Sequence, residues 1–273
     1  MRRILFFLFC FAATAAHAAD ATLTAAWNDN VDNASRRPDR IGGLQFHGDV
    51  TMRQMHELGA DWALFLGGAL SAEAWPRFDG LDSIAAGPRL ALQRKFGLGA
   101  FAPALRLELG ADGVAADESA RSGPAGTAAL RLVQRFSAAT RAELSGELAR
   151  LDARGAVFAR TGETLAAGLD HDLDERWRVS LQFAWRDGDV VSYATPPRPD
   201  LRAVARTLIA NDTFERPFIV YRLGAHTLDY RIALSPALDE RTALSLAFGL
   251  RETARPGVRY VNHLVSLGLT RQF

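Results

Sequence analysis

Apolar and polar residues alternate with a period of two along much of the chain. In the clearest case, Trp177 to Arg186, the odd-numbered residues are apolar and the even-numbered ones are polar or small. Side chains of a strand point alternately to opposite faces, so this period predicts a strand with one apolar face. After residue 19 the sequence has no run of 18 apolar residues, and the pattern therefore predicts strands rather than helical membrane spans.

The same alternation divides the chain into twelve predicted strands. An even number of antiparallel strands brings both ends of the chain to the same side of a membrane. We expect strands near residues 21–30, 41–55, 60–72, 84–96, 99–111, 125–137, 140–151, 161–171, 176–187, 216–235, 241–252 and 260–273.

The predicted connections alternate between short and long, as in outer-membrane barrels with short periplasmic turns and longer extracellular loops. The short connections are 55–59, 96–98, 137–140, 172–176 and 236–241. The long ones are 31–41, 71–83, 111–126, 152–161, 188–216 and 252–259.

The composition of the two strand faces favours a membrane protein over a soluble β-sandwich. The apolar faces are mostly leucine with Trp, Tyr or Phe near their ends, which is typical of a lipid-facing band between aromatic girdles. The opposite faces carry charges in mid-strand, which suit a polar lumen. Because lipid cannot satisfy an open sheet edge, the first and last strands must pair. The predicted fold is all-β, a closed antiparallel transmembrane β-barrel of about 12 strands.

The first 19 residues predict a cleaved signal peptide, and residues 20–273 the barrel. Arg2 and Arg3 precede a short apolar run at 4–15 and a small-x-small site at 16–18. Cleavage would remove Cys10, the single cysteine, and leave 30 basic against 31 acidic side chains. A nearly neutral charge balance gives no reason to expect nucleic-acid binding. Without cysteine we expect no disulfide and no thiolate metal site.

The charged residues of the predicted strands fall on the face opposite the leucines. Arginine at the bilayer midplane costs about 2–4 kcal/mol, so this face must be the lumen. The candidate lumen residues are Arg89, Arg131, Arg135, Arg178 and Arg186, with Glu143 and Glu147 opposite. Further inward charges are expected at Arg53, Arg106, Arg231, Arg251, Asp49, Glu108, Asp170 and Asp229. Two interpretations remain open: an ion-pair network that fills the barrel, or a polar pathway with a mild preference for anions.

The longest predicted loop, 188–216, contains one stretch with helical spacing. Leu201, Val204, Ala205 and Leu208 follow the i, i+3, i+4, i+7 pattern behind Asp200 as a helix cap. The loop either folds inward and constricts the lumen or lies as a lid or disordered segment on the surface.

Two short motifs carry a resemblance to known proteins. The segment from Trp27 to Val31 (Trp-Asn-Asp-Asn-Val) and the closing strand from Tyr260 to Phe273 resemble those of Gram-negative outer-membrane barrels. The chain is similar to porin-like barrels and to the barrel part of surface-lipoprotein assembly modifier proteins. The resemblance implies an outer-membrane location and recognition of Phe273 by the barrel-assembly machinery, although Arg271 stands where an aromatic residue is usual.

The histidines do not form a convincing catalytic site. Lipid-processing barrels need a histidine beside a serine or water at the outer rim, and neither His226 nor His263 has a serine that the pattern places there. We therefore expect no catalytic residue, no metal and no cofactor. The favoured function is a monomeric porin-like barrel in outer-membrane lipid that passes small polar solutes. The alternatives are a closed structural or assembly barrel acting through its loops on a surface protein and, third, a lipid-processing enzyme.

Overall fold

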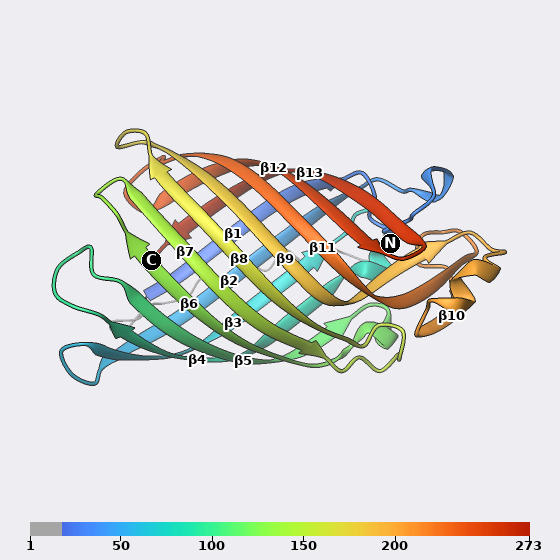
Figure 1. Ribbon diagram of the computed structural model, residues 1–273, viewed down its shortest axis with the longest axis horizontal. Coiled ribbons are helices and arrows are strands. Elements are labelled where there is room, and N and C mark those ends of the chain that lie inside the picture. Colours follow the sequence, from blue (N-terminus) through green and yellow to red (C-terminus); the bar gives the residue numbers. More distant parts are fainter. Residues whose placement is uncertain (1–17) are drawn as a thin grey trace.

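The chain forms one closed barrel of long, tilted antiparallel strands (Figure 1). A computed structural model describes residues 18–273, so all but the last two residues of the predicted signal peptide lie outside the described part. The strands are β1 (Ala18–Asn28), β2 (Gly43–Glu57), β3 (Trp62–Ala74), β4 (Ser83–Lys95), β5 (Ala104–Ala116), β6 (Gly123–Arg135), β7 (Thr140–Leu151), β8 (Arg160–Asp172), β9 (Trp177–Ala194), β10 (Thr207–Asn211), β11 (Phe218–Pro236), β12 (Thr242–Arg255) and β13 (Val258–Gln272).

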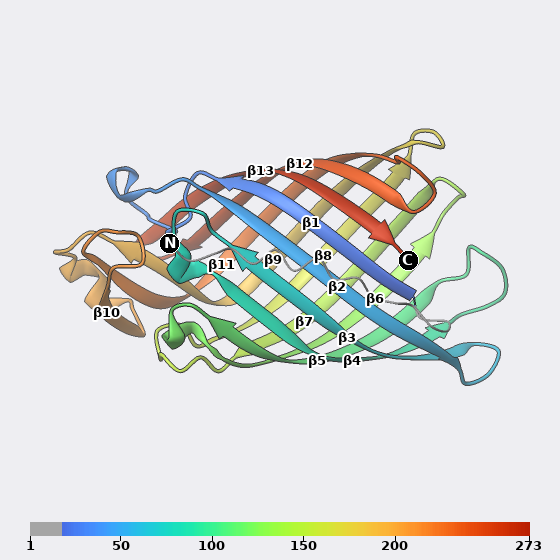
Figure 2. The same cartoon turned by 180° about the vertical axis from the view of Figure 1, so that it is seen from behind.

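The wall of the barrel is a ring of twelve strands. Each strand pairs with its sequence neighbours, β9 pairs directly with β11, and β1 closes the ring against β13 from Asn28↔Leu264 to Asp20↔Gln272. Figure 2 shows this seam between the first and last strands. The short strand β10 pairs only with β11 and stands outside the ring. The predicted fold class and strand number are confirmed.

Two predicted boundaries outside the 188–216 segment are wrong. The fifth strand was expected at 99–111, but β5 runs from Ala104 to Ala116, because residues 96–103 form a turn in which Phe96 N–H donates to the Pro103 carbonyl at 2.8 Å. The last predicted loop, 252–259, is a tight turn at Pro256 and Gly257. Gly257 has φ of 84°, which glycine adopts without steric cost.

The outer surface of the ring is apolar, as the alternation predicts. On β9, Leu181 and Phe183 are exposed, and so are Leu246 of β12 and Leu267 of β13. Large apolar side chains left facing outward over a whole barrel require a hydrocarbon surrounding. Among the described residues no helix is long and apolar enough to cross a membrane. The outward-facing apolar band identifies the chain as a transmembrane β-barrel of the outer-membrane type.

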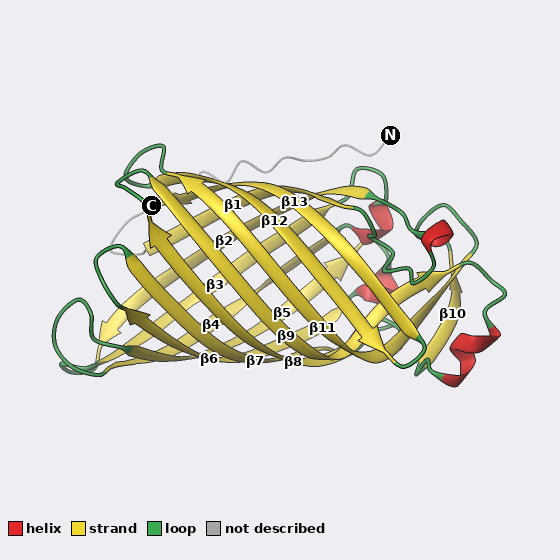
Figure 3. Ribbon diagram, turned by 45° about the horizontal axis from the view of Figure 1, so that its top comes forward, coloured by secondary structure: helices red, strands yellow, loops and turns green. Residues whose placement is uncertain are grey.

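Strands β9 and β11 extend far beyond their neighbours at the end with the long loops (Figures 1 and 3). Pairing of β8 with β9 stops at Gly188, and pairing of β12 with β11 stops at His226. Beyond these points β9, β11 and β10 form a three-stranded extension. Gly188 stands at its base with φ of 151°, where a Cβ atom would lie 2.4 Å from the Thr161 carbonyl oxygen.

The prediction of residues 188–216 as one loop containing a helix is wrong, because the backbone there forms strands and a short 3-10 turn. Residues 189–194 continue β9, a 3-10 turn, η4, covers Pro199–Ala203, and β10 follows. The predicted apolar face is nevertheless used, because Leu201 is fully buried and Val204 and Leu208 pack around the same cluster. Pairing of β10 with β11 supplies backbone hydrogen bonds that the helix would otherwise have made.

The lipid-facing position of Leu267 yields a test. Replacing Leu267 by Arg should lower the free energy of unfolding in lipid vesicles by about 2–4 kcal/mol, because the charge would face hydrocarbon. The matched control is Leu98→Arg in the β4–β5 turn, where the side chain is 93% exposed and the cost should be below about 1 kcal/mol. Equal losses in the two variants in a urea titration would contradict the assignment of the faces.

Candidate functional site

The candidate site is the polar interior of the ring, and the strand register places the predicted charges there. Arg131, Glu143 and Glu147 line one cavity together with Arg89. Arg178 and Arg186 lie on the face of β9 opposite the exposed Leu181 and Phe183. Alternation along a strand is what sends arginines inward and leucines outward on the same element.

An ion-pair network crosses β4, β5, β6 and β7. Arg89 donates two hydrogen bonds to Asp112, at 2.7 and 2.9 Å. Arg131 bridges Glu108 and Glu143, at 2.9 Å each. Bidentate and bridging guanidinium contacts are stronger than single-contact ion pairs, and they hold the arginine and carboxylate side chains in fixed positions. This network matches the interpretation of a filled, shape-holding interior on this side of the barrel.

Further pairs continue the network around the ring. Arg141 contacts Asp170 at 3.0 Å, and Ser180 donates to the same carboxylate at 2.7 Å. Arg178 contacts Asp172 at 2.6 Å, so this candidate is a paired residue. Two pairs lie elsewhere in the ring, Arg251 with Asp229 and Arg53 with Asp20.

A second group of inward arginines has no carboxylate partner within 4 Å in the described part of the chain. Its members are Arg135, Arg160, Arg186 and Arg231. Arg135, Arg186 and Arg231 are exposed on inward faces, so their guanidinium groups meet water inside the ring or at its periplasmic rim, whereas Arg160 lies at the extracellular end of β8 near Arg121. Three of them belong to β8, β9 and β11, which are consecutive in the wall.

The side of the lumen formed by β4 to β7, here called the paired wall, carries the Arg89–Asp112 fork and the Arg131 bridge. In the ring, β9 lies six strands from β3, and β11 six strands from β4, so each pair faces across the lumen. A cavity of about 700 Å³ opens along the paired wall. Phe65 lines it, and the Arg106 guanidinium lies 4.6 Å from the centre of that ring. Ion pairs also lie on β8, β9 and β11, which carry Asp170, Arg178 and Asp229, and the unpaired Arg186 and Arg231 lie among them.

Sequence reasoning missed three lumen residues for identifiable reasons. Asp112 fell outside the predicted fifth strand, which was placed five residues too early. Arg160 lies one residue before the predicted eighth strand and was counted as loop. Arg141 shares the face of Glu143 and Glu147, so the alternation alone could have found it.

The extracellular mouth is covered by a packed lid. The lid consists of the β9–β10–β11 extension, residues 189–224, together with the loops that meet it. One buried core joins Tyr193 and Val220 of the extension to Phe78 of the β3–β4 loop, Phe158 of the β7–β8 loop and Ile41 of the β1–β2 loop. These five side chains are at most 6% exposed. Loops from separate sides of the ring therefore meet over the lumen.

A second core attaches the other face of the extension to the inner wall. Tyr221 and Leu223 of β11 and Leu201 of η4 pack against Val258 and Tyr260 at the upper end of β13. Val258 and Tyr260 have the inward parity of Ser266 on the same strand. The extension is therefore held on both faces and stands across the mouth.

The β1–β2 loop, residues 29–42, ties this lid to the barrel. Asn262 of β13 is fully buried and donates to the Asn30 carbonyl at 2.6 Å and to the Asn33 side chain at 3.1 Å. Asn33 in turn donates to the Val191 carbonyl at 3.0 Å, and Tyr193 N–H donates to the Asp32 carbonyl at 2.9 Å. We call Asn30, Asp32, Asn33 and Asn262 the latch. The asparagines of the two resembling motifs thus have a structural role that spacing alone did not reveal.

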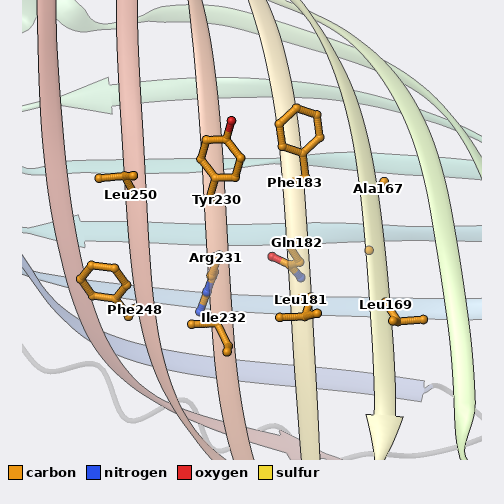
Figure 4. A pocket seen from close by; sticks show the side chains of 11 residues that line it. Ala167, Leu169, Leu181, Gln182, Phe183, Tyr230, Arg231, Ile232, Phe248 and Leu250 are labelled. Carbon is orange, nitrogen blue, oxygen red and sulfur yellow. The ribbon is translucent and has the colours of Figure 1, made fainter.

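The depression shown in Figure 4 lies on the outside of the barrel. Its lining is apolar, it holds about 520 Å³, and it includes Leu181, Phe183, Tyr230 and Phe248. These are outward residues of the lipid-facing band. The depression therefore belongs to the membrane surface and not to the path through the lumen.

The outer-rim histidines face carboxylates. His226 lies 3.1 Å from Asp187, and His263 lies 2.7 Å from Asp29. Within the described residues, neither imidazole hydrogen-bonds to a serine or threonine hydroxyl. In that same region no three His, Cys, Asp or Glu side chains are placed to hold a metal ion.

The predicted assembly residue ends the last strand at the periplasmic side. Phe273 is 62% exposed, and its N–H donates to the Ala19 carbonyl at 2.8 Å. The Arg271 guanidinium lies 5.5 Å from the centre of the Phe273 ring. The side chain is therefore accessible at the seam between β1 and β13, which recognition by assembly machinery would need.

Comparison with solved structures supports the barrel architecture. The chain is similar to the COG4313 outer membrane channel from Pseudomonas putida F1, with a TM-score of 0.58 and 10% identity over 93% of this chain and 95% of that one. It is also similar to the NanC porin, with a TM-score of 0.50 and 6% identity over 93% of this chain and all of that one. No protein-family model and no curated sequence matches the chain. The likeness confirms the expected porin-like outer-membrane fold.

The two classes of arginine differ in what their removal should do to stability. Arg131→Gln should lower the free energy of unfolding by about 1 kcal/mol, because two carboxylates lose their bridge in a partly solvated site. Arg186→Gln should stay within about 0.5 kcal/mol of the parent, because no ion pair is broken. Unfolding of both variants in urea, followed by tryptophan fluorescence, measures the difference. A larger stability loss for Arg186→Gln than for Arg131→Gln would contradict the assignment of Arg131 to the ion-pair network and of Arg186 to the unpaired group.

Proposed function

We propose that the barrel passes small polar solutes across the outer membrane by passive diffusion, with a preference for anions. The observation that carries this proposal is the pair of unpaired, water-exposed arginines on the adjacent strands β9 and β11, Arg186 and Arg231. A barrel that needed its charges only for shape would pair them, because an unpaired charge in a confined space is costly. Charges that line an aqueous path, by contrast, set its ion selectivity.

The paired wall contributes stiffness to the same path. The Arg131 bridge and the Arg89–Asp112 fork tie neighbouring strands together and leave little net charge. Of the predicted selectivity residues, Arg186 and Arg135 therefore act on permeating ions, while Arg89, Arg131, Arg178 and Glu143 hold the wall. Glu147 lines the cavity beside them. Arg231 joins Arg186 as a selectivity residue.

The protein acts without catalysis in this proposal. The structurally similar proteins named above are a channel and a porin by their titles. The rim histidines have carboxylate partners, which hold an imidazole but do not provide a nucleophile. The barrel works as a monomer, surrounded by outer-membrane lipid and inserted by the assembly machinery through Phe273, and it requires no cofactor.

The packed lid also favours a second candidate, the closed structural barrel that acts through its loops on a surface protein. Buried cores over the mouth are what such a barrel would need. The two candidates differ in one measurable property, since a structural barrel passes no current whatever is done to its lid.

Ion selectivity tests the first candidate. The refolded barrel should conduct in planar bilayers, and its reversal potential across a salt gradient should indicate anion preference. The double variant Arg186→Gln/Arg231→Gln should shift the reversal potential toward cations, because free positive charge leaves the path. The matched control is Arg89→Gln/Asp112→Asn, which removes an equal number of charges as a neutral pair and should leave selectivity unchanged. Equal reversal potentials in parent and double variant would refute selection by the free arginines.

A further inference from the structure

We propose that the β9–β10–β11 extension is a gate, held shut over the lumen by the latch on the β1–β2 loop. This inference rests on the proposed function, since a gate matters only if the lumen beneath it conducts. It concerns the lid rather than the charged walls, and so it can fail separately.

The barrel wall is complete without the extension. It begins at Gly188 on β9 and ends at Ala225 on β11, where the two strands pair with each other and where the neighbours β8 and β12 stop. Within residues 189–224, the pairing between ring strands is that of β9 with β11 alone, and every other ring pair is formed outside this segment. The extension can therefore move without opening the barrel wall.

Contacts between the extension and the facing loops are the ones that must break. The β5–β6 loop contributes Glu118, which accepts from Asn211 at 2.8 Å and from Thr213 at 2.9 Å. Arg121 of the same loop contacts the Tyr193 hydroxyl. The β1–β2 loop supplies the latch. Apolar packing on both faces holds the closed position, and these polar contacts fix its orientation.

The latch contains a buried carboxyl group with an unpartnered oxygen. Asp32 is fully buried, its Oδ1 accepts from Ile41 N–H at 2.8 Å, and its Oδ2 has no hydrogen-bond partner. A buried carboxylate without a cation is costly, whereas the protonated acid is tolerated. Desolvation raises the pKa of Asp32 to about 7. The closed lid is therefore more stable with a protonated, neutral Asp32 than with an ionised one.

The groups that face Asp32 do not supply a compensating contact. Asp39 of η1 (Arg37–Asp39) raises the pKa of Asp32 further, and Arg216 of the β10–β11 turn lowers it without an ion pair within 4 Å. Strand β9 contributes the Tyr193 N–H, which donates to the Asp32 backbone carbonyl. Below the ordinary pKa of 3.8 the acid is neutral with the lid open or closed. As pH rises toward 7, only the open lid lets it ionise, so rising pH favours opening.

Removing the extension tests the gate directly. Residues 189–224 are replaced by the turn Asn-Gly, which joins Gly188 to Ala225 as a two-residue hairpin. Heat-modifiable migration on gels verifies that the barrel has folded. We expect the truncated barrel to stay open in planar bilayers, while the parent is closed for most of the recording. Equal open times in the two proteins would overturn the gate and leave the proposed function standing. Silence of the folded, truncated barrel would overturn the proposed function and the gate with it.

Point variants of the latch keep the lid in place and test how it is held. Asn262→Ala removes the donors to Asn30 and Asn33 and should raise the open probability by about tenfold, the effect of losing roughly 1.4 kcal/mol of closed-state stability. The matched control is His263→Ala, on the opposite face of β13, whose contact with Asp29 lies outside the latch. Equal open probabilities in Asn262→Ala and the control would remove the latch from the gate.

Asp32→Asn tests the direction of the pH effect. The amide retains the acceptor for Ile41 N–H and cannot ionise. The parent should open more at pH 8 than at pH 4, by about tenfold or more, whereas Asp32→Asn should have the same low open probability at both values. A parent that opens more at pH 4, or a variant with the pH dependence of the parent, would overturn the role of Asp32 in the latch.

Discussion

The structure depends on the need to satisfy backbone hydrogen bonds where there is no water. Hydrocarbon cannot accept or donate, so an open strand edge inside a bilayer would leave a row of unpaired peptide groups. The pairing of β1 with β13 removes that edge along nine consecutive residue pairs, from Asp20↔Gln272 to Asn28↔Leu264. Once the ring is closed, alternation along each strand sorts every side chain either to lipid or to the lumen. The outward leucines and the inward arginines are two consequences of the same constraint.

Much of the ring could be predicted because that sorting is local. The inner and outer faces of a strand such as Trp177–Ala194 can be read from the alternation in its own sequence, and the register then aligns the faces of the neighbouring strands. The charged pairs were harder, since a pair joins two strands and needs both registers. Asp112 shows the effect, because a five-residue error in one strand hid the partner of Arg89. Arg135, Arg186 and Arg231 could be listed as inward from the sequence, but not recognised as unpaired.

The lid could not be predicted by the same reasoning, because its stability comes from contacts between distant loops. Leu201, Val204 and Leu208 have a helical spacing, and yet pairing of β10 with β11 and packing on β13 determine their backbone. Likewise, residues 28–30 fall at the end of the first predicted strand, 21–30. Only the structure shows that Asn262, more than two hundred residues later, closes the network around them. Tertiary packing overrides local propensity where a segment lies outside a regular ring.

The division between ring and lid separates two properties that a pore protein must control. Arg186 and Arg231 lie on β9 and β11 within the ring, and the extension lies beyond Gly188 and His226. In the described part of the chain, the latch side chains make no hydrogen bond or ion pair with Arg186 or Arg231. A change in the latch can therefore alter how long the path is open without altering which ions it admits, and a change in the lumen can do the reverse. Such independence follows from the geometry, because β9 and β11 continue upward as a hairpin from a wall that is already complete below them.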